Sequence, residues 1–168
     1  RDLDRLVAAS KRVPIAVVLQ LATVSDPLSK AIAPGAPSAT ERLEALAQLA
    51  AAGVLTGVLM APVLPFLTDD PKAAVSLVTA AAEAGARFFY TRWNTLFSPH
   101  QWQLFEAQSA GAFTGLAKRC HEVFGEDLCV TGTDPAALQR SILEACAERG
   151  LAYKAADIAA LVQQSAKP

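Results

Sequence analysis

The stretch GVLTGVLMAP, residues 53–62, decides the fold: it is an apolar run that glycine opens and proline closes. A continuous apolar run of this length is typical of a strand that is covered on both faces of a parallel sheet. We therefore predict a buried strand here. A second apolar run at residues 15–21 and an aromatic run at residues 88–93 predict two further strands, one on each side of the first along the chain.

Helices are predicted between these strands. Ser38 and Glu41 have the spacing of a capping box, in which two side chains satisfy free backbone N–H groups at a helix start, and Gly53 ends that helix. Asp70 followed by proline is typical of a second helix start, and Gly85 ends it. Strands that recur at intervals of roughly 35 residues with a helix between them predict right-handed crossovers, a parallel sheet and the α/β class.

The chain changes character after residue 97. Further helices are predicted over residues 99–110, 115–124, 135–148 and 156–164, with a short extended piece before the last one. We therefore predict two parts: residues 1–97 with strand-helix units, and residues 98–168 as a mainly helical extension packed on them.

Composition excludes several classes of protein. Lys and Arg number 15 against 16 Asp and Glu, without clustering, so no basic footprint for nucleic acid is present. The three cysteines form neither a disulfide framework nor a zinc motif, which favours a reducing, cytoplasmic compartment and predicts no metal ligands. No apolar stretch is long enough for a membrane span. Because the chain starts at Arg1 rather than Met, we expect sequence upstream.

The candidate site lies in the loops after the predicted strands, because parallel α/β sheets bind ligands beyond the carboxyl ends of their strands. Gln20 lies at the end of the first predicted strand and Thr23 follows that strand, Pro62 follows the second strand, and Arg92 lies at the end of the third. Proline gives the second loop a rigid shape, and an arginine at a strand end is suited to an anion. The alternatives are a plain strand terminator at Pro62 and a solvated side chain at Arg92.

Other chemistry finds little support. Asp69 and Asp70 are acid/base candidates, although a carboxylate before proline is first of all a helix cap. His100 and His121 lack an evident third partner, so a structural role is favoured for both. No dinucleotide fingerprint, P-loop or nucleophile elbow occurs. The catalytic residues are therefore unknown at this level.

Four segments together resemble the second half of the radical SAM superfamily, and most of all its subgroup related to spore photoproduct lyase. The family pattern is EPGAPS, then RL-x-AL, an AG turn, and a strand ending in APIIPGLND. The corresponding residues here are APGAPS at 33–38, RLEAL at 42–46, AG at 52–53 and APVLPFLTD at 61–69. Residues 90–93, YTRW, resemble the following strand, and the likeness extends over about residues 1–95.

The resemblance implies the carboxyl-terminal half of a partial (β/α)6 barrel, with about three βα units in residues 1–97. It implies S-adenosylmethionine (SAM) and a [4Fe-4S] cluster as cofactors, and cleavage of SAM to a 5'-deoxyadenosyl radical. The family's cluster motif CxxxCxxC is absent from this chain, so a missing amino-terminal half of the barrel is the implied partner and an isolated chain is expected to be inactive. Gln20, Thr23, Pro62 and Arg92 are the implied cofactor-binding residues, and the implied substrate is a nucleic acid or a small molecule.

Two positions depart from the family pattern. Ala33 stands where the family has Glu, and Gln20 stands where Ser is common. These changes favour the alternative of a degenerate, non-catalytic α/β domain that serves as a binding or interaction module. A third hypothesis is an unrelated barrel enzyme with its site in the same loops. As a partial sheet, the chain is also expected to expose an apolar strand edge near Val17 and Leu19.

Overall fold

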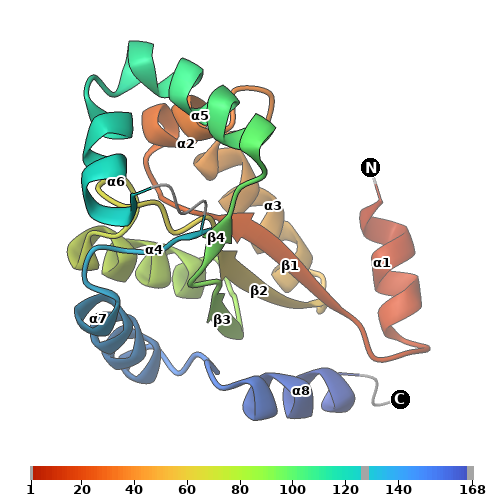
Figure 1. Ribbon diagram of the computed structural model, residues 1–168. Coiled ribbons are helices and arrows are strands. Elements are labelled where there is room, and N and C mark those ends of the chain that lie inside the picture. The colour runs from red at the N-terminus through yellow and green to blue at the C-terminus, as the bar shows by residue number, and fades with distance from the viewer. Residues whose placement is uncertain (1, 126–128, 166–168) are drawn as a thin grey trace.

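The computed structural model describes residues 2–125 and 129–165 and places helices around a small parallel sheet (Figure 1). The strands are β1 (Ala16–Leu21), β2 (Leu55–Met60) and β3 (Phe88–Thr91), with the short β4 (Thr95–Leu96) and β5 (Cys129–Val130). The helices are α1 (Leu3–Ser10), α2 (Asp26–Ile32), α3 (Ala39–Ala51), α4 (Pro71–Glu83), α5 (Pro99–Ala112), α6 (Leu116–Phe124), α7 (Pro135–Glu148) and α8 (Ala155–Gln164).

The main sheet has the order β1-β2-β3, and both pairings are parallel. Leu19 lies opposite Val58, and Val58 lies opposite Phe89. The three predicted strands, their common direction and the α/β class are therefore confirmed. The sheet is open: its described strands do not close into a barrel.

Two helices between the strands, α3 and α4, begin at the capping residues that the sequence predicted. At the start of α3 the Glu41 main-chain N–H donates to Ser38 Oγ at 3.1 Å, and the Ser38 main-chain N–H donates to Glu41 Oε2 at 2.7 Å. Asp70 caps α4 by accepting a hydrogen bond from the Ala73 N–H at 2.8 Å. Gly53 adopts a φ of 81° after α3, a conformation that a side chain would strain.

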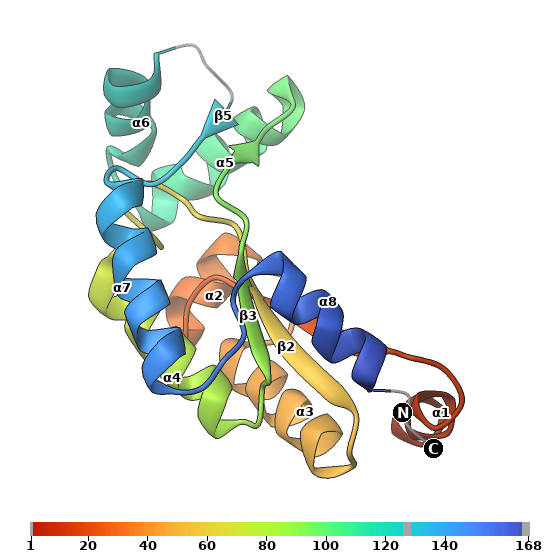
Figure 2. The same cartoon turned by 90° about the horizontal axis from the view of Figure 1, so that it is seen from below.

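One face of the sheet carries the main core. Val58 and Phe89 point to this face and pack against side chains of α3, α4 and α7, among them Leu46, Leu77 and Ile142, all completely buried. Full burial of one such side chain contributes roughly 1.5–3 kcal/mol. This face therefore holds the helices to the sheet, and Figure 2 shows α3 and α4 on the same side of the strands.

The opposite face is largely open. Residues here alternate with the core positions, so Val18, Leu59 and Tyr90 share this face. Val18 is 47% exposed and Tyr90 is 46% exposed, whereas the strands of a parallel sheet are usually covered on both faces. Helix α8 lies beside this face in Figure 2, and the Ser165 hydroxyl behind it donates to the Ile15 carbonyl at 3.2 Å.

Residues 98–168 contain the predicted helices together with a rudimentary fourth strand. The Ala152 N–H donates to the Arg87 carbonyl at 3.0 Å, and the Phe89 N–H donates to the Ala152 carbonyl at 2.9 Å. This parallel bridge lies beside β3, and α7, which precedes it, packs on the same core as α4. The strand-helix repeat thus continues once more, with β4, α5, α6 and β5 inserted between β3 and α7.

The insertion has a core of its own. Trp102, Leu116, Cys120 and Val130 are buried together, and β4 pairs antiparallel with β5. The boundary that we expected after residue 97 lies just after β4 in the chain. The strand that pairs with β4, β5, lies within residues 98–168. In the described part of the chain, no helix has the length and apolar character that crossing a bilayer requires.

Candidate functional site

A polar pocket lies at the carboxyl ends of the three parallel strands. It is lined by Gln20 of β1, by Ala61 and Pro62, which follow β2 in the chain, and by Arg92 and Thr95, which follow β3. Its volume is about 220 Å³. Three of the four predicted site residues, Gln20, Pro62 and Arg92, therefore meet in one place. They meet because parallel strands bring their carboxyl ends to the same edge of the sheet.

Hydrogen bonds of the backbone and of long side chains hold these walls in position. The Arg92 main-chain N–H donates to the Met60 carbonyl at 3.1 Å and so extends the β2–β3 pairing to the pocket. Gln20 Nε2 donates to the Ala61 carbonyl at 3.2 Å. From α3, a guanidinium nitrogen of Arg42 donates to the Gln20 carbonyl at 2.8 Å. Hydrogen bonds therefore connect the end of β1 both to the segment that follows β2 and to α3.

The loop behind β2 is organised by Thr68. Its hydroxyl donates to the Pro62 carbonyl at 2.9 Å and accepts a hydrogen bond from the Leu64 N–H at 2.7 Å. Thr68 is buried, and the peptide bond between Ala61 and Pro62 is cis. The rigid loop predicted from the two prolines is therefore reinforced by a buried threonine that the sequence analysis did not identify.

Arg92 gives the polar pocket its charge. It is exposed. Among residues 2–125 and 129–165 it is the only charged residue that lines the pocket, and no carboxylate within these ranges forms an ion pair with it. A guanidinium has five N–H donors. Because the described residues supply no carboxylate to pair with it, the Arg92 guanidinium is suited to bind a carboxylate or phosphate of a ligand.

Thr23, the fourth predicted residue, does not line the pocket. It is 6% exposed, and its hydroxyl accepts a hydrogen bond from the Ser25 N–H at 3.1 Å. Ser25 in turn caps α2, accepting from the Leu28 N–H at 3.3 Å. Thr23 therefore shapes the connection from β1 to α2. Thr23 lies two residues after the end of β1, and from the sequence alone a structural threonine at such a position cannot be distinguished from one that binds a ligand.

The two aspartates near this edge have structural partners. Asp70 is the cap of α4, as the following proline indicated. Asp69 Oδ2 accepts hydrogen bonds from the main-chain N–H and the hydroxyl of Thr133, at 2.8 and 2.7 Å. Neither carboxylate lines the polar pocket.

Thr95 and Ala61 are the pocket residues that sequence reasoning missed. Ala61 directly follows β2 and Thr95 begins β4, but an alanine and a threonine carry no distinctive chemistry in a sequence. Thr95 and Pro62 also border a second, adjoining cavity of about 250 Å³, whose other walls include Leu64, Phe97 and Phe105. The edge of the sheet therefore offers a polar and an apolar compartment side by side.

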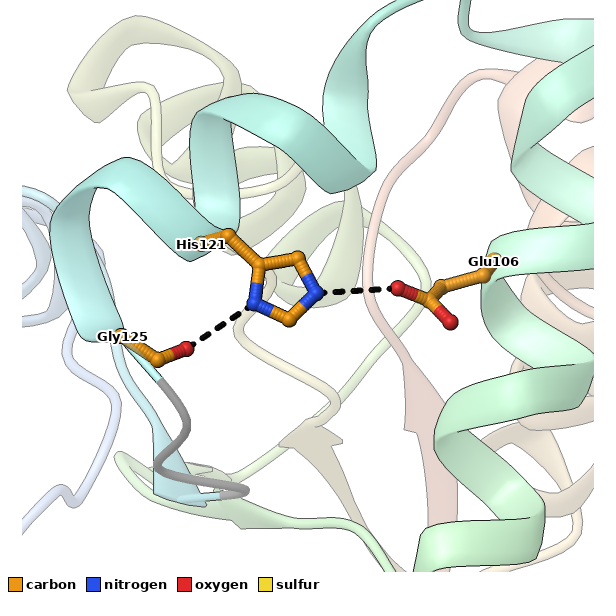
Figure 3. A network of polar contacts seen from close by, with 3 residues as sticks. All are labelled: Glu106, His121 and Gly125. Atoms are coloured by element: carbon orange, nitrogen blue, oxygen red, sulfur yellow. Dashed lines mark hydrogen bonds and ion pairs between the residues drawn. The ribbon is translucent and has the colours of Figure 1, made fainter.

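Histidine and cysteine side chains lie outside the polar pocket. His121 of α6 contacts Glu106 of α5 through Nε2 at 3.1 Å and the Gly125 carbonyl through Nδ1 at 3.1 Å (Figure 3). Burial raises the pKa of the Cys146 thiol to about 12, and burial also raises the pKa of Cys120. In the part of the chain that the structure describes, no three His, Cys, Asp or Glu side chains are grouped to hold a metal ion.

Fold and site together define an α/β protein with a small pocket that contains an arginine, at the carboxyl edge of an open parallel sheet. No family model and no solved structure matches the chain. Uncharacterized proteins of Mycobacterium bovis and of two strains of Mycobacterium tuberculosis are each 36% identical to it over 86 residues. The similar segment is 51% of this chain, and it spans only 25% of the length of each relative.

Proposed function

We propose that this chain is the carboxyl-terminal portion of a radical SAM enzyme related to spore photoproduct lyase. The observation that carries the proposal is the convergence of Gln20, Pro62 and Arg92, from the ends of three successive parallel strands, on one pocket. Two of the motifs that resemble the family reach this pocket: Ala61 and Pro62 of residues 61–69 line it, and Arg42 of residues 42–46 donates to the carbonyl of the lining residue Gln20.

The open face of the sheet supports a half-barrel. In a closed barrel, the face opposite the helices points inward and is covered by the remaining strands. Here that face carries the exposed side chains of Val18 and Tyr90, and β1 is the terminal strand of the described sheet. We propose that an upstream half of the barrel pairs with β1 and encloses this face.

The described residues do not fit the [4Fe-4S] cluster. Cluster ligation requires several thiolates close together, whereas Cys120 and Cys146 are each buried in a different core and no metal-ligating group is formed. In the proposal the cluster is therefore held outside the described part of this chain.

The polar pocket does fit part of SAM. Arg92 is suited to the carboxylate of its methionine moiety, and the Gln20 amide and Ala61 carbonyl are suited to its hydroxyl and amine groups. When bound, SAM supplies the 5'-deoxyadenosyl group for hydrogen abstraction from substrate. The role of this chain is to orient that ligand, through Arg92 and Gln20, against the rigid loop that contains Pro62.

The test uses the full-length gene product, reconstituted anaerobically with iron and sulfide and then supplied with SAM and dithionite. We expect 5'-deoxyadenosine, measured by chromatography and mass spectrometry. Arg92→Gln is expected to raise the KM for SAM by roughly tenfold or more, since a charge-assisted hydrogen bond is worth about 1.5–3 kcal/mol. The control is Arg140→Gln, which changes an exposed arginine of α7. A full-length sequence without CxxxCxxC, or no 5'-deoxyadenosine from the reconstituted protein, would contradict the proposal.

A second candidate function is a non-catalytic interaction module. The specific observation in its favour is again the open face, because Val18, Leu59 and Tyr90 form an apolar strip across the sheet on which a partner protein can pack. Under this hypothesis a tight complex forms through the strip while the reconstituted full-length protein produces no 5'-deoxyadenosine.

A further inference from the structure

The apolar compartment beside the polar pocket has a lining of distinctive chemistry. Its apolar walls are Ile32 of α2, Pro62 and Leu64 behind β2, Phe97 ahead of α5, and Leu104 and Phe105 of α5, and its volume is about 250 Å³. None of the described residues that line it is charged. Pro62 and Thr95 line both compartments, so the two cavities adjoin at these residues.

Aromatic packing fixes the wall that the insertion contributes. The Phe97 ring lies 5.3 Å from Trp102 and 5.4 Å from Phe105, and Trp102 lies 5.5 Å from Phe105, measured between ring centroids. Trp102 is buried in the core of the insertion. On this side the compartment is thus bounded by Phe97 and Phe105, which belong to a packed aromatic cluster.

The two polar side chains in the lining already have partners. Gln101 Oε1 accepts a hydrogen bond from the Ser98 N–H at 2.9 Å, at the start of α5. The Thr95 hydroxyl donates to the Val63 carbonyl at 3.4 Å. A nucleobase inserted here would lose water from several polar edge atoms and regain few hydrogen bonds, and each buried polar group without a partner costs about 1–3 kcal/mol. An aliphatic or aromatic group meets no such penalty.

We propose that this compartment is the substrate subsite and that the substrate is a small molecule with an aliphatic or aromatic body, not a nucleic acid. This inference rests on the proposed function, in that the polar pocket beside it holds SAM. Either compartment alone is smaller than the roughly 300–1,000 Å³ of ordinary ligand sites, and the two together reach that range. The scarcity of cations in the lining agrees with a substrate other than nucleic acid, since Arg92 is the only charged residue among the described residues that line either compartment.

The experiment titrates the full-length gene product with 1-octanol, thymidine and S-adenosylhomocysteine separately, and follows the amide signals of the residues in this chain by NMR. Octanol is expected to shift the signals of Phe97 and Leu104. Leu104→Asp places a charge in the compartment and is expected to weaken octanol binding by roughly tenfold or more, as the loss of apolar contact and the desolvation of a carboxylate predict. Leu104 is 47% exposed, so the variant should fold. The control is Leu143→Asp, at a 39% exposed leucine of α7.

The outcomes separate this inference from the proposed function. Retained S-adenosylhomocysteine binding in Leu104→Asp, together with lost octanol binding, supports both. Octanol shifts that map to Val18 and Tyr90, equal octanol binding by the two leucine variants, or stronger shifts from thymidine than from octanol would overturn the substrate class alone. Octanol binding in the expected place without any S-adenosylhomocysteine binding to the wild-type full-length protein would count against the polar pocket as the SAM site, and would remove the substrate role of the apolar compartment with it.

Discussion

Asp69 accepts two hydrogen bonds from Thr133, one from the main-chain N–H at 2.8 Å and one from the hydroxyl at 2.7 Å. Asp69 lies in the loop behind β2, and Thr133 lies between β5 and α7. Gly132 packs closely here, since a Cβ at this position would come within 3.1 Å of the Asp69 Cβ. The link therefore ties the far end of the insertion to the loop that frames the candidate site.

Removing this link should loosen the insertion. We expect Asp69→Ala to lower the free energy of unfolding by about 1–2 kcal/mol, because the Thr133 N–H and hydroxyl lose a charged acceptor. Thr133→Val removes only the hydroxyl contact and should cost less. Urea unfolding measures both values, with Asp157→Ala of α8 as the control at an exposed aspartate. Equal stability of Asp69→Ala and the control would show that the contact contributes nothing.

Gly57 leaves room for the ring of Phe88. A Cβ built on Gly57 would overlap the ring of Phe88, its partner on β3, and Phe88 is itself 3% exposed. We expect Gly57→Ala to destabilise the protein by about 1–3 kcal/mol, the usual cost of overpacking. Gly35→Ala is the matched control, because nothing lies within 4 Å of its Cβ position. Thermal unfolding of the two variants checks the difference, and similar melting temperatures would refute it.

The start of α3 should make stability depend on pH. Hydrogen bonds from the Thr40 N–H to Asp26 and from the Ser38 N–H to Glu41 hold the pKa of each carboxyl below its ordinary value, 3.8 for Asp26 and 4.5 for Glu41. A lowered pKa in the folded state means that the stabilisation is present above these ordinary values. It is lost as the pH falls through the lower folded-state values.

Substitution of both carboxyls should reduce this dependence. In Asp26→Asn with Glu41→Gln, we expect the free energy of unfolding to fall less steeply below pH 4.5 than in the wild type. The control replaces Glu44, an exposed residue of the same helix, by Gln. Urea unfolding at a series of pH values gives the slopes, and the same slope in wild type and double variant would be inconsistent with the hydrogen bonds described.

The edge of β1 should drive association of the isolated chain. β1 is the terminal strand of the sheet, and Val18 on it is 47% exposed. A charge on an apolar edge strand discourages strand pairing between molecules, so Val18→Lys is expected to shift the chain toward the monomer. Val123→Lys, at a 54% exposed valine of α6, is the control. Sedimentation velocity at increasing concentration distinguishes them, and a wild-type chain that stays monomeric would contradict the expectation.

Much of the fold could be predicted because its signals are local. Apolar runs marked β1, β2 and β3, Ser38 and Glu41 marked the start of α3, and Asp70 marked the start of α4. The spacing of these elements then left the parallel arrangement as the consistent one, and that arrangement located the loops of the candidate site. A capping box or a buried strand can be recognised from a few neighbouring residues because its hydrogen bonds or apolar contacts recur in every protein that contains it.

Which loop residues meet was decided by the tertiary structure alone. Gln20 and Arg92 reach the same pocket, whereas Thr23, only three residues beyond Gln20, is buried in a turn of its own. The bridge of Ala152 to β3 and the pairing of β4 with β5 were likewise beyond the sequence pattern. These contacts join residues that are far apart in the chain. Whether they form depends on how the intervening helices pack, and this packing cannot be read from a short stretch of sequence.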